Sequence, residues 1–451
     1  MRHLLCVQKA RGLHAKQSAT REKNEKIKVF SLHRKNFTKN CFSDIIFIEV
    51  IIVIKRKEYL DKLISWREKQ VIKVVTGVRR CGKSTLFKLY IEYLKNEGIS
   101  EEQIISINLE DLAFDNLLEY HDLYNYVSDR LCEGKCTYVF IDEVQECHKF
   151  EKVVDSLFIK ENVDVYITGS NAHMLSGELA TLLSGRYIEI GMLPLSFKEY
   201  CDFAEGENVQ EKFNNYLKGG SFPYVAMLEN DSNAIRNYIE GIYNTILIKD
   251  IARREGIGDI AVLESIVRFL ASSIGSPISA KKISDTINSS GRRISVNTVD
   301  SYLRALTESF IFYKVNRYDV KGRQFLKTLG KYYIVDTGIR ELLINISGLD
   351  IGHILENVVY LELIRRGYKV SVGKLAEKEI DFVAKNSDGT EYYQISASVL
   401  DEKTLERELA PLQKIQDNYA KYLLTLDEII PKADYDGIRQ RSIIDWLLGL
   451  D

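Results

Sequence analysis

The sequence predicts an α/β fold: a five-stranded parallel sheet lies between layers of helices and is followed by smaller helical and α/β units. Short apolar segments alternate with amphipathic segments between residues 71 and 195, and the predicted strands end in polar or acidic residues. Beyond residue 196 the apolar period becomes helical. A chain of 451 residues is also long enough for several compact units.

The composition is typical of a soluble globular protein. Apolar residues make up 45% of the chain and the formal net charge is -2, so any basic surface must be local. The 7 cysteines are scattered, which fits reduced thiols in a cytoplasm better than a disulfide framework or a zinc site. The most apolar run, residues 42–54, is too short for a membrane-spanning helix of about 20 residues. We therefore expect a cytoplasmic protein with no membrane partner.

Residues 1–54 are expected to form a poorly ordered basic extension. Residues 1–40 are rich in lysine and arginine and show no sustained helical or strand period. A transit peptide, a basic arm, or translation from upstream of the functional start would each explain this composition. Its charge therefore carries little weight in a functional argument.

The first folded unit is expected to cover residues 55–195. An amphipathic pattern predicts a helix over residues 83–96, with Leu86, Leu89, Tyr90 and Tyr93 on one face. Apolar runs predict strands at residues 71–75, 104–108, 138–141, 163–167 and 187–190. Parallel strands joined by helices form an αβα sandwich.

A glycine-rich loop between the first predicted strand and the first predicted helix is the strongest motif. It matches G-x-x-x-x-G-K-[ST] and comprises Gly77, Val78, Arg79, Arg80, Cys81, Gly82, Lys83, Ser84 and Thr85. The glycines let the backbone wrap around phosphates, Lys83 reaches the β and γ phosphates, and Ser84 offers an oxygen to Mg²⁺. The loop therefore predicts a P-loop fold that binds a nucleoside triphosphate with Mg²⁺.

Two carboxylates end the apolar strand of the segment YVFIDE. Asp142 is placed to hold Mg²⁺ through its water ligands, and Glu143 is placed to orient and polarise an attacking water. Together with Lys83, Glu143 predicts hydrolysis of the bound nucleotide.

Two further polar positions are candidates for sensing the γ-phosphate. In TGSN we select Ser170, with Thr168 and Asn171 as rivals, although an ordinary helix cap explains the segment equally well. Arg186, just before the fifth strand, is a candidate arginine finger, in which case it could act on the nucleotide of a neighbouring subunit in a homo-oligomer. A surface or capping arginine is the alternative.

These motifs, in this order, resemble an AAA+ ATPase core. GVRRCGKST, FIDEVQ, ITGSN, LLSGRY, LPLSFKEY and GGSFP resemble the prokaryotic AAA-type ATPases that carry a C-terminal domain of unknown function, from about Lys55 to Ser398. The resemblance implies ATP as the nucleotide, and no Asn-Lys-x-Asp motif follows the core to suggest guanine. It also implies that Arg56 lies near the base, with a solvated basic run as the alternative.

The middle of the chain is expected to contain a helical lid and a winged helix. Residues 196–258 read as helices interrupted by GGSFP, and residues 259–345 as three helices followed by a hairpin. The helices are predicted at residues 261–274, 280–288 and 296–308, and the strands at residues 310–315 and 331–335. Candidate contacts to DNA phosphates are Arg292, Arg293, Lys321, Arg323, Lys327 and Lys331. Asp300 and Glu308 weaken this signal, and winged helices also serve as packing modules.

Residues 346–451 are predicted to form a small α/β domain that resembles restriction endonucleases, with a degenerate nuclease site. A helix at residues 355–366 precedes strands at residues 368–372, 379–384 and 391–396, and then helices. Glu356 and Asp381 form a weak second cation site, but Gln394 and Ser396 stand where such nucleases carry an acid and a lysine.

The leading hypothesis is an ATPase that moves its C-terminal half against a DNA or protein partner. An active ATP-regulated nuclease and a nucleotide switch with little turnover are the alternatives.

Overall fold

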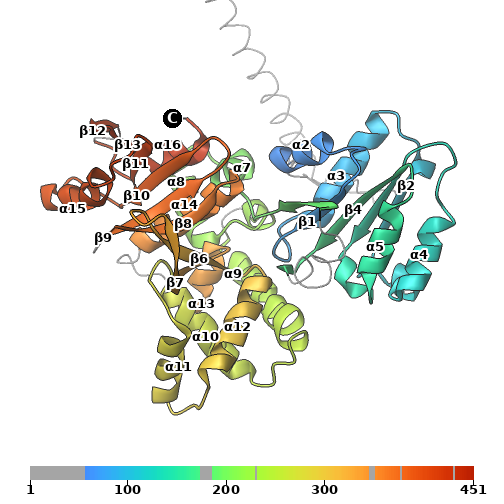
Figure 1. The fold of residues 1–451 in the computed structure, drawn as a ribbon, viewed down its shortest axis with the longest axis horizontal. Helices are drawn as coiled ribbons and strands as arrows, with labels where there is room; N and C mark the ends of the chain where they lie inside the picture. The colour runs from blue at the N-terminus through green and yellow to red at the C-terminus, as the bar shows by residue number, and fades with distance from the viewer. Residues whose placement is uncertain are drawn as a thin grey trace, which may run out of the picture. The chain divides into compact units, whose positions relative to one another are not determined.

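The computed structural model describes residues 56–172, 185–228, 231–344, 351–375, 378–429 and 432–450, without the side chains of residues 326–328. The extension predicted over residues 1–54 lies outside these ranges, as does the helical stretch predicted just before Arg186. The described chain begins with helix α2 (Lys57–Ser65) and ends with helix α16 (Ile443–Leu448), as Figure 1 shows.

The first sheet has five strands, all parallel, as the sequence predicted. Their order across the sheet is β2-β3-β4-β1-β5. The strands are β1 (Ile72–Thr76), β2 (Ile104–Asn108), β3 (Thr137–Asp142), β4 (Val163–Gly169) and β5 (Tyr187–Gly191). Since parallel strands end at the same edge, the loops after β1, β3 and β4 meet there, which is the usual ligand-binding edge of an open α/β sheet.

Alternation along the strands explains why both faces of this sheet are covered. Val75, Phe140 and Tyr166 pack in one apolar cluster with α3 (Lys83–Asn96), while Val74, Ile141 and Ile167 belong to a second cluster on the other face. Two helices contribute to that second cluster, α4 (Tyr120–Ser128) and α5 (Phe150–Phe158). The expected αβα sandwich is therefore present.

Helices fill the segment expected to be a helical lid. They are α7 (Phe197–Phe203), α8 (Val209–Gly219), α9 (Ser232–Thr245) and a π-helical continuation, η6 (Ile246–Arg253). A short 3-10 turn, Val225–Met227, follows the GGSFP segment. Gly220 ends α8 with a φ of +84°, and a side chain there would collide with the carboxylate of Asp336.

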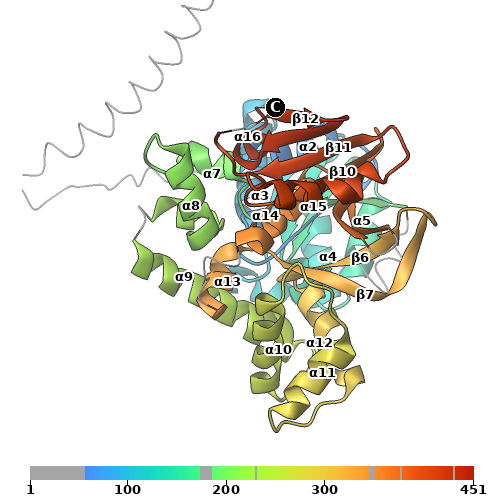
Figure 2. The same cartoon turned by 90° about the vertical axis from the view of Figure 1, so that its left-hand side faces the viewer.

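Three helices and a hairpin follow in the predicted order. The helices α10 (Ile260–Ser272), α11 (Ala280–Ser289) and α12 (Val296–Glu308) lie together in Figure 2, and the hairpin consists of β6 (Phe312–Asp319) and β7 (Gln324–Ile334). The hairpin is longer than predicted and pairs with β8 (Lys369–Leu375). Residues on both sides of the boundary predicted at 345 therefore share one sheet, and the winged helix remains a prediction.

The second sheet has eight strands in the order β12-β13-β11-β10-β9-β8-β6-β7. The remaining strands are β9 (Lys378–Lys385), β10 (Thr390–Ile395), β11 (Ala420–Thr425), β12 (Ala433–Tyr435) and β13 (Ile438–Ser442). The accompanying helices are α13 (Thr337–Ile344), α14 (Ile351–Arg365) and α15 (Glu402–Gln413). The prediction that only helices follow β10 was wrong, because three short strands extend the sheet. In the described part of the chain, no helix is both long and apolar enough to cross a membrane.

Candidate nucleotide-binding site

The P-loop joins β1 to α3, where backbone geometry demands glycine at two positions. Gly77 has a φ of +151°, and a side chain there would collide with the carbonyl oxygen of Met192. Gly82 has a φ of +109° and stands at the N-terminal cap of α3. The tight loop and the exposed N–H groups of the helix N-terminus form the cradle that phosphate oxygens require.

Lys83 points back into this loop. Its side chain is buried, its Nζ donates to the carbonyl oxygen of Gly77 at 3.0 Å, and it lies 3.4 Å from a carboxylate oxygen of Glu143. Burial works to lower the pKa of Lys83, but the charge of Glu143 outweighs it and the pKa is raised. A charged ammonium therefore stands in the phosphate cradle, held by a carbonyl and a long ion pair.

Asp142 supplies a buried carboxylate at the end of β3. The hydroxyls of Thr168 and Ser84 both form hydrogen bonds with this carboxylate. Burial raises the pKa of Asp142, while the two hydroxyls oppose the increase. A carboxylate beside the Ser84 hydroxyl is the kind of hard oxygen pair that Mg²⁺ prefers, so these residues fit the ion that the P-loop implies.

Glu143, directly after β3, is fixed by its neighbours. Its φ is +52°, and its N–H donates to Oγ1 of Thr168 at 2.9 Å. Nε2 of Gln145 donates to its carboxylate at 2.6 Å and lies 3.4 Å from Oγ of Ser170. Burial works to raise the pKa of Glu143, but Lys83 and the bond from Gln145 lower it, so the carboxylate is ionised.

The structure thus brings Lys83, Asp142, Glu143 and Ser170 together. Sequence reasoning missed Gln145, although it follows Glu143 by two residues in FIDEVQ.

Arg79 ties the P-loop to the helical segment that follows the sheet. Its guanidinium forms two hydrogen bonds to Asp250 in η6, at 2.9 and 3.0 Å, and two to Glu110, at 2.9 and 3.2 Å. Bidentate arginine–carboxylate pairs fix both distance and orientation. No sequence pattern predicts this contact, because Arg79 and Asp250 are 171 residues apart.

Arg56 supports the loop from the other side. It is 3% exposed and donates to the carbonyl oxygens of Cys81 and Leu193 at 2.9 and 2.7 Å. It also pairs with Glu199 at 2.8 Å. The alternative of a solvated basic run was therefore wrong for Arg56, and its proximity to the base stays a prediction.

Arg186 lies at the opposite end of the sheet from its own P-loop. Its carbonyl oxygen accepts from the N–H of Ile72 at the start of β1, whereas the P-loop follows the end of that strand. Its guanidinium pairs with Asp155 and lies 5.5 Å from the ring centroid of Phe158. Contact with its own nucleotide is excluded by this placement, and contact with a neighbour's nucleotide stays a prediction.

The second predicted site contains a lysine that sequence reasoning assigned elsewhere. Lys331 is 2% exposed, and its Nζ pairs with Glu356 at 2.8 Å and with Glu379 at 2.7 Å. The prediction that Lys331 contacts DNA was wrong because its ammonium is buried among these carboxylates. Tyr333 adds a hydrogen bond to Glu356 at 2.5 Å.

Asp381 is half-buried and adjoins the same cluster. It accepts the N–H of Ile395 at 2.8 Å, and burial, reinforced by the charge of Glu356, holds its pKa well above the ordinary value. Gln394 donates to Glu408 at 2.8 Å. Among the described residues no group of three or more His, Cys, Asp or Glu side chains is arranged to hold a metal ion.

The parallel sheet, the glycine loop and the acidic strand end define a nucleotide-binding protein of the P-loop class. Comparison with known proteins narrows this class. An AAA domain family matches residues 69–201, and a domain of unknown function (DUF8612) matches residues 210–350. The chain is 40% identical over 401 residues to an uncharacterized protein of Haemophilus influenzae, covering 88% of this chain and 99% of that protein.

Two more distant similarities were also found. An uncharacterized protein of Methanocaldococcus jannaschii is 28% identical over 363 residues, covering 76% of this chain and 78% of that protein. The solved Walker-type ATPase PABY2304 of Pyrococcus abyssi is 17% identical with a TM-score of 0.46, covering 64% of this chain and 96% of that chain. The chain belongs to the AAA+ P-loop ATPase family, and in it the AAA domain is followed by a domain of unknown function.

Proposed function

We propose that this protein hydrolyses ATP in the presence of Mg²⁺ and uses the cycle to move its C-terminal half against a partner in the cytoplasm. The observation that carries the proposal is the ionised Glu143 carboxylate 3.4 Å from the Lys83 ammonium inside the glycine cradle. A cation for phosphate and a carboxylate for water are the two groups that phosphoanhydride hydrolysis requires from the protein.

Each group has a defined task in this proposal. Lys83 and the loop N–H groups bind the phosphates, while Ser84 and Asp142 would hold Mg²⁺. When bound, this ion would neutralise part of the charge on the phosphate oxygens. Glu143 orients the attacking water, and Gln145 fixes its carboxylate and lies within reach of Ser170. Ser170 is 1% exposed, which fits a hydroxyl that meets the γ-phosphate rather than bulk solvent.

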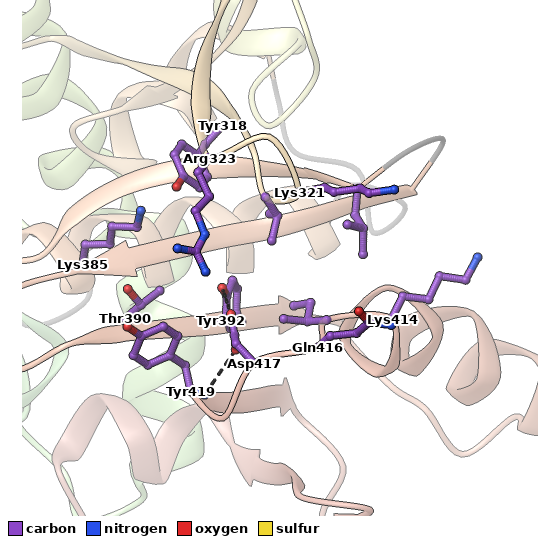
Figure 3. A pocket seen from close by; sticks show the side chains of 13 residues that line it. Tyr318, Lys321, Arg323, Lys385, Thr390, Tyr392, Lys414, Gln416, Asp417 and Tyr419 are labelled. Carbon is purple, nitrogen blue, oxygen red and sulfur yellow. Dashed lines mark hydrogen bonds between the residues drawn. The ribbon is translucent and has the colours of Figure 1, made fainter.

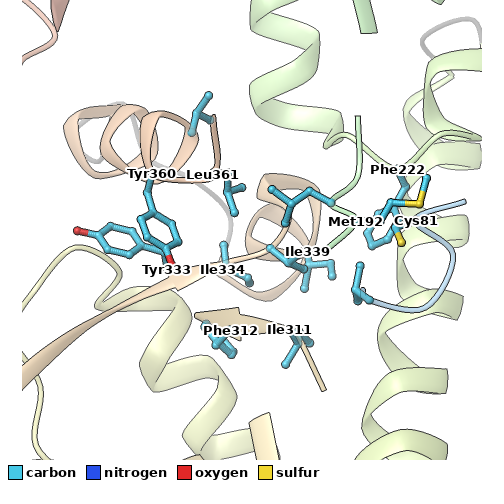
Figure 4. Close-up of a cluster of buried hydrophobic side chains, with 14 of the residues drawn as sticks. Cys81, Met192, Phe222, Ile311, Phe312, Tyr333, Ile334, Ile339, Tyr360 and Leu361 are labelled. Atoms are coloured by element: carbon cyan, nitrogen blue, oxygen red, sulfur yellow. The ribbon is translucent and has the colours of Figure 1, made fainter. Parts of the chain in front are cut away.

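Two connections from the P-loop support the proposed movement. Arg79 binds Asp250 in η6, so a shift of the loop changes a contact to the helical segment. On the other side, Phe222 of GGSFP is buried in the apolar cluster that includes Cys81 and Met192 (Figure 4).

GGSFP is in turn bound to the C-terminal half. The hydroxyl and the N–H of Ser221 donate to Asp336, at 2.8 and 2.5 Å, directly before α13. Asp336 is fully buried, so it cannot exchange these hydrogen bonds for water without cost. These contacts make a continuous path from Cys81 to α13.

A steady-state phosphate-release assay tests hydrolysis. Wild type should release phosphate from MgATP, whereas Lys83→Met and Glu143→Gln should each lose about 100-fold or more, because each removes a charged group from the transition state. Lys88→Met on the exposed face of α3 is the matched control and should keep wild-type turnover. Equal release from all four proteins would defeat the proposal.

The alternative of a nucleotide switch predicts a different result in the same assay. A switch would bind MgATP tightly, show negligible release in the wild type, and change partner binding in Glu143→Gln as it does in wild type. Stimulation of release by DNA would favour a nucleic-acid partner.

An active nuclease remains the second candidate because Lys331 restores a lysine beside Glu356 and Asp381. The ammonium, however, is already bound by two carboxylates, which favours a structural cluster. Incubation of Mg²⁺- or Mn²⁺-loaded protein with DNA and RNA decides between them. Cleavage that Asp381→Ala abolishes would establish the nuclease, and cleavage that survives this substitution would remove Asp381 from the assignment.

A further inference from the structure

A basic and aromatic pocket lies in the C-terminal half, formed by residues that take no part in the nucleotide site. Its volume is about 700 Å³, within the range of ligand-binding pockets. The walls come from the β6–β7 turn, the adjoining ends of β8, β9 and β10, and the loop after α15. Figure 3 shows Arg323 extending from the hairpin turn towards Thr390 and Tyr392 on β10.

The charge of this pocket is strongly unbalanced. Four cations line it and one carboxylate does, that of Asp417. The hydroxyl of Tyr392 donates to Asp417 at 2.6 Å and the N–H of Tyr419 at 3.2 Å. Within the described chain, no ion pair is formed by any of the four cations, which are Lys321, Arg323, Lys385 and Lys414.

Such a cluster is costly in a protein whose net charge is -2, because like charges repel and the one carboxylate in the pocket lining, Asp417, offsets only part of the repulsion. An anionic ligand would relieve this repulsion. The separation of the cations between a hairpin turn, a strand end and a helix end suits an extended chain of charges better than a single anion.

Aromatic rings stand beside these cations. Tyr419 is 50% exposed, and the Lys385 ammonium lies 3.9 Å from the ring centroid of Tyr318. Phe325, 66% exposed, meets Tyr318 edge to face with ring centroids 5.4 Å apart. Exposed rings next to cations are the arrangement on which unpaired bases stack while their phosphates are neutralised.

We infer that this pocket binds single-stranded nucleic acid, with phosphates at the four cations and bases against Tyr419 and Tyr318, which line the pocket, and against Phe325, which adjoins Tyr318 outside the lining. A duplex would present only phosphates, because its bases are stacked on each other and cannot reach the rings. An acidic peptide would form ion pairs with the cations but has no bases to stack on the rings. The inference names the partner class left open in the proposed function and rests on that proposal only for its role in the ATPase cycle.

Fluorescence anisotropy of a labelled oligothymidylate with the full chain tests the inference. Lys321→Glu/Lys414→Glu should weaken binding about tenfold or more and reduce the salt dependence, because each side chain neutralises a phosphate. Tyr419→Ala should weaken binding about fivefold or more, while Tyr419→Phe, which keeps the ring, should bind like wild type. Lys403→Glu, an exposed lysine near the other end of α15, is the matched charge control.

Competition identifies the ligand class. Unlabelled oligothymidylate or oligouridylate should displace the probe, and a duplex, thymidine monophosphate or polyglutamate should compete poorly. Equal losses in Lys403→Glu and the pocket variant would overturn the inference, as would full binding by Tyr419→Ala. Displacement by polyglutamate at equal charge, or by the mononucleotide at equal concentration, would overturn the assignment to a strand.

The same titration with Lys83→Met separates this inference from the proposed ATPase. Oligonucleotide binding should persist in Lys83→Met. If the wild type binds the oligonucleotide but does not turn over ATP, only the proposed ATPase activity is refuted. Turnover without strand binding would refute only the pocket.

Discussion

Lys83 and Lys331 are both buried and both face carboxylates, and they differ in how readily they exchange partners. Lys83 is held by the Gly77 carbonyl and by a 3.4 Å ion pair to Glu143. If the lysine moves, Glu143 keeps the hydrogen bond that it accepts from Gln145. Lys331 is bound at 2.8 and 2.7 Å by two carboxylates, and it offsets part of their charge. The first arrangement can release its ammonium to a phosphate, whereas the second is an internally satisfied ion cluster.

Removal of Lys331 should give the largest stability change. Lys331→Met leaves Glu356 and Glu379 without their cation, and Glu356 is buried, so we expect a loss of about 3–5 kcal/mol in the free energy of unfolding. Urea denaturation measures this loss. Lys314→Met, an exposed lysine on β6, is the control and should change stability by less than about 0.5 kcal/mol.

A double variant sharpens this result. Lys331→Met/Glu356→Gln removes the cation together with the buried charge it neutralised, so it should recover part of the loss. If the single variant loses less than about 1 kcal/mol, the cluster is not the closed network described above. Lys331 would then resemble a surface lysine.

The protonation of Asp381 should make the stability of the protein depend on pH. Its pKa is held well above the ordinary value of 3.8, so the folded state binds the proton more tightly than the unfolded state. The stability this group contributes is complete below that ordinary value and is lost as pH rises towards the raised pKa. Wild type should therefore lose stability relative to Asp381→Asn from about pH 4 upward, by at most about 1.4 kcal/mol per pH unit.

Denaturation of both proteins at several pH values measures this difference. Asp388→Asn, an exposed residue in the β9–β10 turn, is the control and should run parallel to wild type. A stability difference between wild type and Asp381→Asn that does not change with pH would show that Asp381 is ionised in the folded protein.

Arg186 should give the smallest effect. Its pair with Asp155 is partly exposed and it lies far from its own P-loop, so Arg186→Ala should cost less than about 1 kcal/mol of stability. In dilute protein, MgATP affinity should stay within about twofold of wild type. A tenfold or larger loss of affinity in dilute protein would place Arg186 at its own nucleotide and contradict the strand geometry.

Helices, strands and motifs that depend on neighbouring residues could be predicted from the sequence, whereas contacts between distant residues could not. The helix at residues 83–96 and the strand at residues 104–108 were predicted with correct ends, because their apolar periods and boundary residues are local signals. Strand β13, with the sequence IRQRS, escaped prediction because three of its five residues are charged or amide side chains. It is a strand only because β11 and β12 pair with it.

The sites follow the same rule. Gly77–Thr85, Asp142 and Glu143 could be predicted as site residues because chemistry and sequence spacing coincide in a loop and a strand end. Lys331 was assigned to DNA because it follows a basic stretch, and its true partner Glu356 lies 25 residues further along the chain. The Arg79–Asp250 contact could not be foreseen for the same reason.

Calorimetric titration of MgATP tests the central difference between the two lysines most directly. Lys83→Met should weaken MgATP binding at least about tenfold, because a charged hydrogen bond to phosphate is lost. Lys331→Met, studied at a temperature where it is folded, should bind within about twofold of wild type. Unchanged affinity in Lys83→Met, or lost affinity in folded Lys331→Met, would contradict the account.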